Sequence, residues 1–408
     1  MKKIKLKTIF GISFFFLLVS RILILTDNYA LPIDPIILQI LYILFLVMIL
    51  VVNSNRKVNL KSFKSKDYIK VISILLIHTF LWGNVFVNQA MVDLTNSQFK
   101  SQIMFLVIII LTSYVVIKLD SIDVFIKASF YAISFVLIIQ LILNFSELNL
   151  SNIKNIMNKD ERYRANFGFG HYNTLGGACL CNIILWSLLN KFNHNKIVPF
   201  TFFIVSIIML LCSASRSSIT ALIFYFVILG FEKISNNKMS SKKKTLVCII
   251  KIFIFFILLI FSLNIDFEEL LLESQRSLLF EKSIPEFLGS GRILEGLGYV
   301  SNTAYGTNLT PYTTYWLDNG YIYLLVSTGV LGFLLIFYVI ILLIKNFYFT
   351  KNLFLKNNIY PILLVYLYTS IFEANLFNSG SINNYVYLVI FLYYIYKINY
   401  NKNIIINN

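Results

Sequence analysis

The N-terminal stretch "MKKIKLKTIFGISFFFLLVSRILIL", Met1 to Leu25, decides the class of fold. Basic residues come first, and an apolar run of membrane-spanning length follows them. A cleaved signal peptide begins in the same way, but this run is long, Arg21 interrupts it, and no small-x-small cleavage site follows. The stretch therefore predicts a first transmembrane helix.

The rest of the chain has the composition of a membrane protein. Of its 408 residues, 58% are hydrophobic and only 13% are charged, whereas an ordinary soluble domain carries about 25% charged residues. The mean hydropathy is +0.76. Because backbone polar groups in lipid must be paired within the protein, such apolar runs favour helices. The sequence predicts an all-α, polytopic integral membrane protein.

Apolar windows of about 17 to 25 residues, the length that crosses a bilayer, recur along the whole chain. No internal repeat or low-complexity linker separates them, so we expect one polytopic membrane domain over residues 1–408. The prediction is about twelve transmembrane helices, near residues 8–25, 36–52, 68–88, 102–117, 123–144, 172–190, 197–212, 217–231, 245–264, 320–344, 359–373 and 382–396.

Lysine and arginine are unevenly shared between the gaps that separate these windows. Alternate gaps, starting with the N-terminus and counted with the span ends that border them, hold 24 of the 35 basic residues; the other gaps hold 9, and Arg21 and Lys251 lie deeper within windows. Basic residues are retained on the cytoplasmic face, so both termini are expected in the cytoplasm. The net charge of +16 then sets topology and meets anionic lipid, and predicts no nucleic-acid partner.

Two long loops fall on the outer face, about 145–171 and 265–319, the second between helices 9 and 10. Loops of this length are usually functional or disordered. The four cysteines lie in apolar runs and are expected to be reduced and buried: Cys179, Cys181, Cys212 and Cys248. Neither a disulfide framework nor a metal-ligand spacing is present.

Three outer arginines sit among small polar residues at the boundaries of predicted spans. Arg164 lies in "ERYRANFGFGHYNTLGG", Arg216 in "SASRSS" with Ser213 and Ser215, and Arg292 in "GSGRI". Arginine offers a planar fork of donors that matches phosphate. A single arginine at such a place can also snorkel to lipid headgroups. At these three positions the polar surroundings favour an anion site.

Polar residues also stand where two predicted spans begin. His171 and Asn173 open the sixth span, and a helix N-terminus binds anions. Asp318 and Asn319 open the tenth, where capping is the simplest role. His171 is a natural proton acceptor near neutral pH, and Asp318 is an alternative base or hydroxyl acceptor. "DFEE", Asp266 to Glu269, is a weak metal signal, and no metal is expected.

Four stretches in order resemble the bacterial O-antigen ligase and polysaccharide polymerase superfamily, over roughly residues 160–335. They are "RANFGFGHYNTLGG", with Tyr172 where the family usually has proline, "SASRSS", "GSGRI" and "DNGYIYLLVSTGVLG". Asp318 suits the polymerase (Wzy-type) branch, because the ligase branch tends to have histidine there.

The resemblance implies a GT-C-like glycosyltransferase of the bacterial plasma membrane. Such an enzyme joins undecaprenyl-diphosphate-linked sugar repeats into O-antigen, capsule or exopolysaccharide at the outer face, without a metal or nucleotide cofactor. Arg164, Arg216 and Arg292 would bind the diphosphate, His171 and Asp318 would be catalytic, and Asn173, Ser213, Ser215 and Asn319 would bind sugar. A chain-length regulator and a flippase are the expected protein partners. An O-antigen ligase and a lipid-linked oligosaccharide flippase or transporter are the alternatives.

Overall fold

The computed structural model describes residues 2–27, 35–54, 65–148, 164–190, 197–235, 279–302, 304–306, 317–350 and 352–406. Their regular secondary structure is helical, apart from one isolated bridge between Thr26 and Phe169. The all-α class is therefore confirmed for this part of the chain. The predicted span at 245–264 lies outside the described residues, as does Cys248.

Helices overlap the other eleven predicted windows. The longer elements are α1 (Lys2–Leu23), α2 (Pro35–Ser54), α3 (Lys66–Phe80), α4 (Val92–Leu119), α5 (Ile122–Leu143), α6 (Tyr172–Leu189), α7 (Ile197–Cys212), α8 (Arg216–Ser235), α10 (Ile284–Gly289), α11 (Gly320–Tyr348), α12 (Tyr360–Thr369) and α13 (Ile382–Ile406). Short π and 3₁₀ segments adjoin them: η2 (Leu81–Val85), η3 (Gln89–Met91), η4 (Phe145–Glu147), η6 (Leu279–Ser283), η7 (Ala304–Gly306) and η8 (Leu355–Ile359).

Six helices among the described residues are long and apolar enough to cross a membrane: Lys5–Leu23, Lys66–Val85, Gln89–Leu119, Ile122–Leu143, Tyr172–Leu189 and Gly320–Tyr348. Two shorter apolar helices, Ile36–Val52 and Ile197–Cys212, accompany them. Length and composition thus support a membrane-embedded protein. The count of twelve spans and the GT-C likeness stay predictions.

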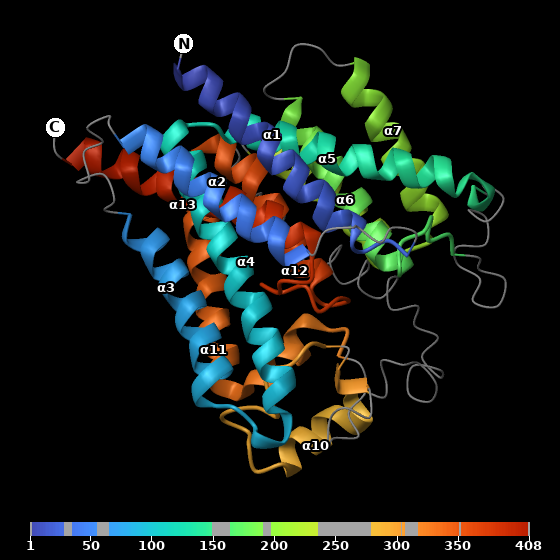
Figure 1. Cartoon of the computed structure of the whole chain (residues 1–408), viewed down its shortest axis with the longest axis vertical. Helices are drawn as coiled ribbons and strands as arrows, with labels where there is room; N and C mark the ends of the chain where they lie inside the picture. The colour runs from blue at the N-terminus through green and yellow to red at the C-terminus, as the bar shows by residue number, and fades with distance from the viewer. Residues whose placement is uncertain are drawn as a thin grey trace. The chain divides into compact units, whose positions relative to one another are not determined.

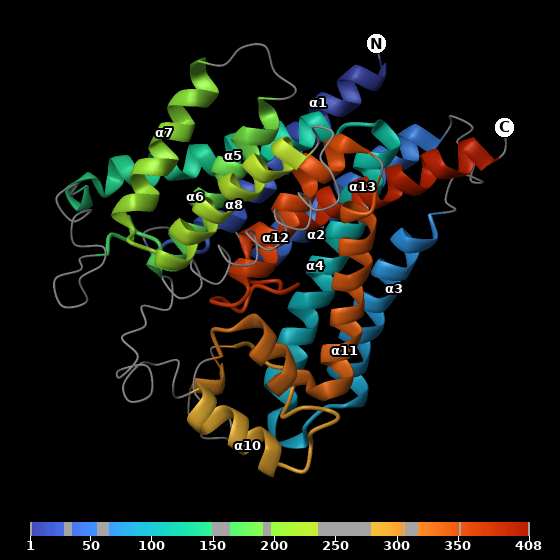
Figure 2. The same ribbon diagram turned by 180° about the vertical axis from the view of Figure 1, so that it is seen from behind.

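The chain divides into two compact units, each assembled from separate segments. Unit 1 comprises Met1–Lys61, Ile108–Val227 and Tyr385–Tyr393. Within it α1 packs along α5 and α2, and α6 lies against α5 and α7 (Figures 1 and 2). A buried amide joins three of these helices, because Asn182 of α6 donates to Ser134 of α5 at 2.9 Å and to Ser206 of α7 at 2.8 Å. Such polar contacts hold helices together where lipid supplies no hydrophobic drive. Cys179, Cys181 and Cys212 are buried, as predicted, and none of the three forms a disulfide.

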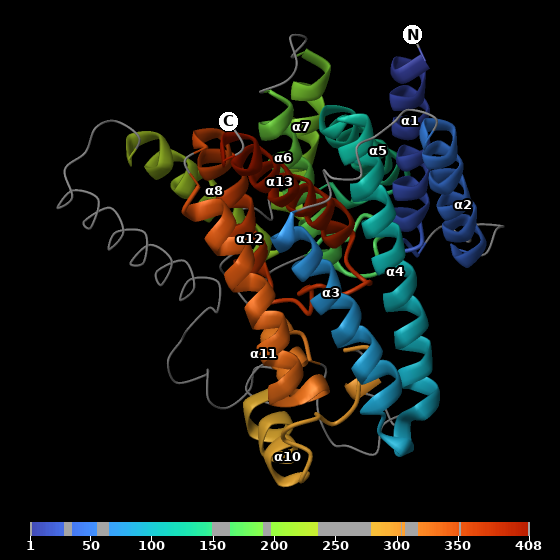
Figure 3. The same cartoon turned by 90° about the vertical axis from the view of Figure 1, so that its left-hand side faces the viewer.

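Unit 2 comprises Ser62–Val107, Ile228–Asn384 and Tyr394–Asn408. Within it α11 packs against α3 and α12 (Figure 3). Helix α11 is interrupted at Gly329, whose φ of 65° and ψ of −173° are not helical. The loop before α11 pairs with the backbone at this break: Val330 N donates to Ile293 O at 2.9 Å, and Leu297 N to Val326 O at 2.8 Å. A broken apolar helix is tolerated because its neighbours satisfy the backbone groups that the break exposes.

Candidate functional site

The loop Arg164–His171, in unit 1, has a fixed path over the ends of two helices. Asp27 N donates to Gly168 O at 2.8 Å and Gly170 N donates to Leu25 O at 3.0 Å, which pairs the loop with the residues after α1. Ala165 N donates to Cys212 O at 3.2 Å, which holds the loop at the end of α7. These hydrogen bonds fix the backbone of the loop, which leads directly into the start of α6.

His171 is the N-cap of α6. Its extended backbone (φ −153°, ψ 137°) lies outside the helix, and its Nδ1 accepts a hydrogen bond from Asn173 N at 3.2 Å. A neutral imidazole has one donor and one acceptor nitrogen. With Nδ1 as the acceptor, the ring proton of a neutral His171 lies on Nε2. The sequence prediction that His171 stands at the start of this helix is confirmed.

Arg164 lies over the ring of Tyr172, with its Cζ 4.2 Å from the ring centroid. The ring of His171 also lies close to Tyr172, with 4.1 Å between centroids. Burial lowers the pKa of the Arg164 guanidinium from its ordinary value, and contact with Tyr172 works against that shift. Arg164 is half-buried, and no carboxylate among the described residues forms an ion pair with it. The geometry provides a cation supported by an aromatic ring and available to an anion.

The "SASRSS" turn between α7 and α8 lies beside the start of α6. Ser215 Oγ donates to Asn173 Oδ1 at 3.1 Å, so the two segments share a hydrogen bond. Ser213 Oγ donates to Leu210 O at 2.7 Å and accepts from Ser215 N at 3.3 Å, which shapes the turn. The structure thus brings Asn173, Ser213 and Ser215 into one polar cluster, and their contact with sugar stays a prediction.

Close packing keeps this turn on α6. A Cβ added at Gly176 would lie 2.7 Å from Ser215 Cβ and 2.9 Å from Ser218 Oγ, so only glycine permits this approach. Arg216 follows Ser215 as the first residue of α8, and it is half-buried. The N-termini of α6 and α8 therefore lie together, and each brings a positive dipole end.

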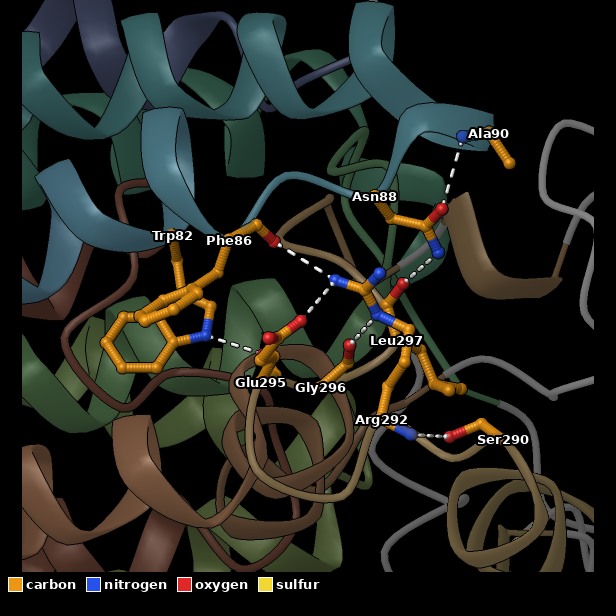
Figure 4. A network of polar contacts seen from close by, with 9 residues as sticks. All are labelled: Trp82, Phe86, Asn88, Ala90, Ser290, Arg292, Glu295, Gly296 and Leu297. Carbon is orange, nitrogen blue, oxygen red and sulfur yellow. Dashed lines mark hydrogen bonds and ion pairs between the residues drawn. The ribbon is translucent and has the colours of Figure 1, made fainter.

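Arg292 belongs to unit 2 and binds its own loop (Figure 4). Its Nε donates to Gly296 O at 3.0 Å, its Nη2 donates to Phe86 O at 3.4 Å, and Nη2 lies 3.0 Å from Glu295 Oε2. Two further bonds hold the same loop, Trp82 Nε1 to Glu295 O and Asn88 Nδ2 to Leu297 O, each 2.6 Å long. Much of the donor capacity of Arg292 is thus used in stabilising the segment that pairs with the break in α11.

Asp318 and Asn319 also belong to unit 2, at the start of α11. Asn319 is the N-cap, since its Oδ1 accepts from Tyr321 N and Ile322 N, both at 3.0 Å. This confirms the capping prediction for Asn319. Asp318 precedes the cap and is partly exposed. Gly320 N donates to Ser370 O at 2.8 Å, which fixes the start of the helix.

Arg164, His171, Asn173, Ser213, Ser215 and Arg216 form what we call the unit 1 cluster. Two residues that contact it or its loop, Tyr172 and Glu147, do not stand out as site residues in the sequence. In the sequence, Tyr172 is notable only because it stands where the resembling family usually has proline. In the structure, the Arg164 guanidinium packs on its ring. Glu147, at the end of η4, accepts hydrogen bonds from the loop backbone. The only signal for Glu147 is a lone carboxylate after the fifth apolar window. Among the described residues, no three His, Cys, Asp or Glu side chains gather as metal ligands, and "DFEE" lies outside those residues.

The comparisons with known proteins return nothing that bears on this site. No protein-family model, no curated protein and no solved structure matches the chain.

Proposed function

We propose that this protein is a bacterial plasma-membrane glycosyltransferase that polymerises undecaprenyl-diphosphate-linked oligosaccharide repeats into surface polysaccharide. The observation that carries the proposal is the unit 1 cluster, where the N-termini of α6 and α8 lie together, with Arg164 packed on Tyr172 of α6 and Arg216 as the first residue of α8. The orientation expected from the basic residues places this cluster on the outer face, where lipid-linked repeats are joined.

An anionic ligand at the membrane surface suits the cluster. Arg164 is half-buried and lacks a carboxylate partner among the described residues. His171 caps α6 at this point, with Nδ1 accepting from Asn173 N, so a neutral ring carries its proton on Nε2. The positive dipole ends of α6 and α8 add to the attraction for an anion. A lipid diphosphate combines two phosphates for these donors with an apolar tail for the surrounding helices.

The chemistry requires little beyond charge stabilisation and one base. The bond between the sugar anomeric carbon and the diphosphate oxygen breaks, and a bond from that carbon to the acceptor hydroxyl oxygen forms. The hydroxyl proton passes to a base, and the lipid diphosphate leaves with the bonding electrons. Arg164 and Arg216 stabilise the charge on the leaving oxygen. Asp318 and His171 are the candidate bases, and the place of Asp318 and Arg292 in this reaction rests on the family resemblance.

The test is purified protein in nanodiscs with synthetic undecaprenyl-diphosphate-linked repeat units. A ladder of lengthening lipid-linked products on a gel supports the polymerase. Transfer of a finished chain to a lipid A core acceptor, without a ladder, indicates a ligase instead. Movement of the lipid-linked unit across a vesicle membrane without elongation indicates a flippase and refutes the proposal.

A further inference from the structure

Glu147 accepts hydrogen bonds from the backbone of the Arg164–His171 loop, which carries residues of the proposed site. It closes the 3₁₀ segment after α5, and its Oε2 accepts from Asn166 N at 2.9 Å and from Phe167 N at 2.7 Å. Successive backbone N–H groups that point at one oxygen form an anion-binding concavity. Here the anion is a carboxylate of the same chain. Charge-assisted bonds of this length are about twice as strong as neutral ones.

The loop conformation at this point needs such support. Phe167 has a φ of 46°, which is uncommon for a residue with a side chain, and Gly168 follows with a φ of 72°. Phe167 is fully buried. Asn166 Oδ1 accepts from Gly168 N at 3.2 Å and reinforces the turn. The Glu147 carboxylate satisfies the two N–H groups that this turn directs inward.

Both ends of the turn carry residues of the proposed site. Arg164 stands two residues before Asn166, and His171 four residues after Phe167. Glu147 directs its charge at the backbone, and it forms no ion pair with Arg164. It therefore fixes the position of Arg164 without neutralising it.

We propose that Glu147 is a positioning residue, which orders the Arg164–His171 loop so that Arg164 and His171 meet the diphosphate of the substrate. This inference rests on the proposed function for its substrate, and on the two backbone bonds alone for its mechanism. What the loop requires is an acceptor oxygen at the right reach. The negative charge of the carboxylate strengthens both bonds.

The experiment compares Glu147→Gln, Glu147→Asp and Glu147→Ala, with the exposed Glu281→Ala as the matched control. Gln keeps an acceptor at the same reach, Asp withdraws it by one methylene, and Ala removes it. Hydrogen exchange of peptides covering 164–171 is measured in nanodiscs, together with kcat and KM for elongation of synthetic lipid-linked repeats. Thermal unfolding of each variant identifies any that misfolds.

We expect the loop amides to exchange fastest in the Ala and Asp variants, and at an intermediate rate in the Gln variant, whose neutral oxygen accepts weaker bonds. Displacing a binding group by about 1 Å costs as much as a hundredfold in rate, so kcat/KM should fall at least tenfold in the Ala and Asp variants. Combining Glu147→Ala with Arg164→Ala should add little further loss, because both changes remove the same contact.

Unchanged exchange in Glu147→Ala would overturn the inference, and so would a Gln variant as inactive as Ala with its loop still protected. The second would assign the carboxylate a direct role in charge or proton transfer. Tighter binding of inorganic pyrophosphate by Glu147→Ala would also contradict it, by showing that Glu147 competes with the substrate. If exchange follows the expectation while even the wild type makes no polymer, the proposed function fails and the loop role of Glu147 stands.

Discussion

Ser215 Oγ donates to Asn173 Oδ1 at 3.1 Å, and this bond joins the start of α8 to the start of α6. A single helix N-terminus attracts an anion weakly, since its charge is partial and screened by water. Here two helix starts lie together, and an arginine belongs to each of them: Arg216 begins α8, and Arg164 packs on Tyr172, the first residue of α6. The cluster therefore differs from an ordinary capped helix end.

Arg164→Ala and Arg216→Ala should each lower elongation by about a hundredfold, the effect of losing about 3 kcal/mol of transition-state stabilisation. Arg→Lys at either position should also lose much of the activity, because a point charge replaces a fork of donors. Initial rates with synthetic repeats, at equal protein levels, measure this. Lys282→Ala, at an exposed position, is the control. Activity retained by both Ala variants would remove the anion site.

Arg292→Ala should behave differently, because Arg292 bonds Gly296 O and Phe86 O within its own unit. Hydrogen bonds from a charged group contribute about 1.5–3 kcal/mol, so this variant should unfold at a lower temperature. Arg164→Ala should not. The comparison uses thermal unfolding in the same detergent. An Arg292→Ala protein of wild-type stability but without activity would point to a direct role in binding phosphate.

Gly296→Ala and Gly329→Ala should each destabilise the protein by about 1–3 kcal/mol. Both glycines have positive φ, 87° and 65°, and a Cβ at either would collide with backbone of the opposing segment. Gly230→Ala in α8 is the control, because a Cβ there would have nothing within 4 Å of it and alanine favours a helix by up to about 1 kcal/mol. Equal unfolding temperatures for all three variants would contradict the account of the α11 break.

The helices were predictable because an apolar window long enough to span lipid has few alternatives to a helix. The break in α11 could not be predicted from the sequence. "STGVLG" reads as an uninterrupted apolar run, and Gly329 leaves the helix only where Ile293 and Leu294 supply carbonyl partners from another segment. Hydropathy contains no information about such a partner.

The unit 1 cluster was predictable in part for the same kind of reason. Arg164, His171 and Asn173 are close in sequence, so their grouping follows from local structure, and Ser215 stands out as a polar residue at a span boundary. Glu147 could not be found in this way, because its partners are backbone N–H groups 19 and 20 residues away. The identity of a residue does not show what its backbone N–H group binds.

The expected topology can be checked with single cysteines in intact cells. The distribution of lysine and arginine predicts that both termini and the segment 232–244 lie in the cytoplasm, and that 265–319 lies outside. A cysteine at Ser240 should resist an impermeant maleimide until the membrane is opened. A cysteine at Leu288, which is exposed, should react at once. The reverse labelling pattern would mean that the orientation is opposite to the predicted one. The unit 1 cluster would then lie on the cytoplasmic face, where lipid-linked repeats are not joined.

The last prediction separates His171 from Asp318 as the base that takes the acceptor proton. Nδ1 of His171 is occupied by the cap to Asn173 N, so a neutral ring carries its proton on Nε2 and donates there. His171→Asn keeps an N-cap acceptor and removes this donor. It should therefore lower the rate by a similar factor at every pH and leave the unfolding temperature near that of the wild type.

Asp318→Asn should act on the pH profile itself. A base works only when deprotonated, so the wild-type rate should rise with pH and then level off. If Asp318 is the base, the Asn variant loses this rise and most of the rate, while His171→Asn retains it. Asn319→Ala is the structural control, which should lose about 1 kcal/mol of stability with the cap of α11 and keep the pH profile. A rising limb that disappears in His171→Asn and persists in Asp318→Asn would make His171 the base, and would require its cap to open during the reaction.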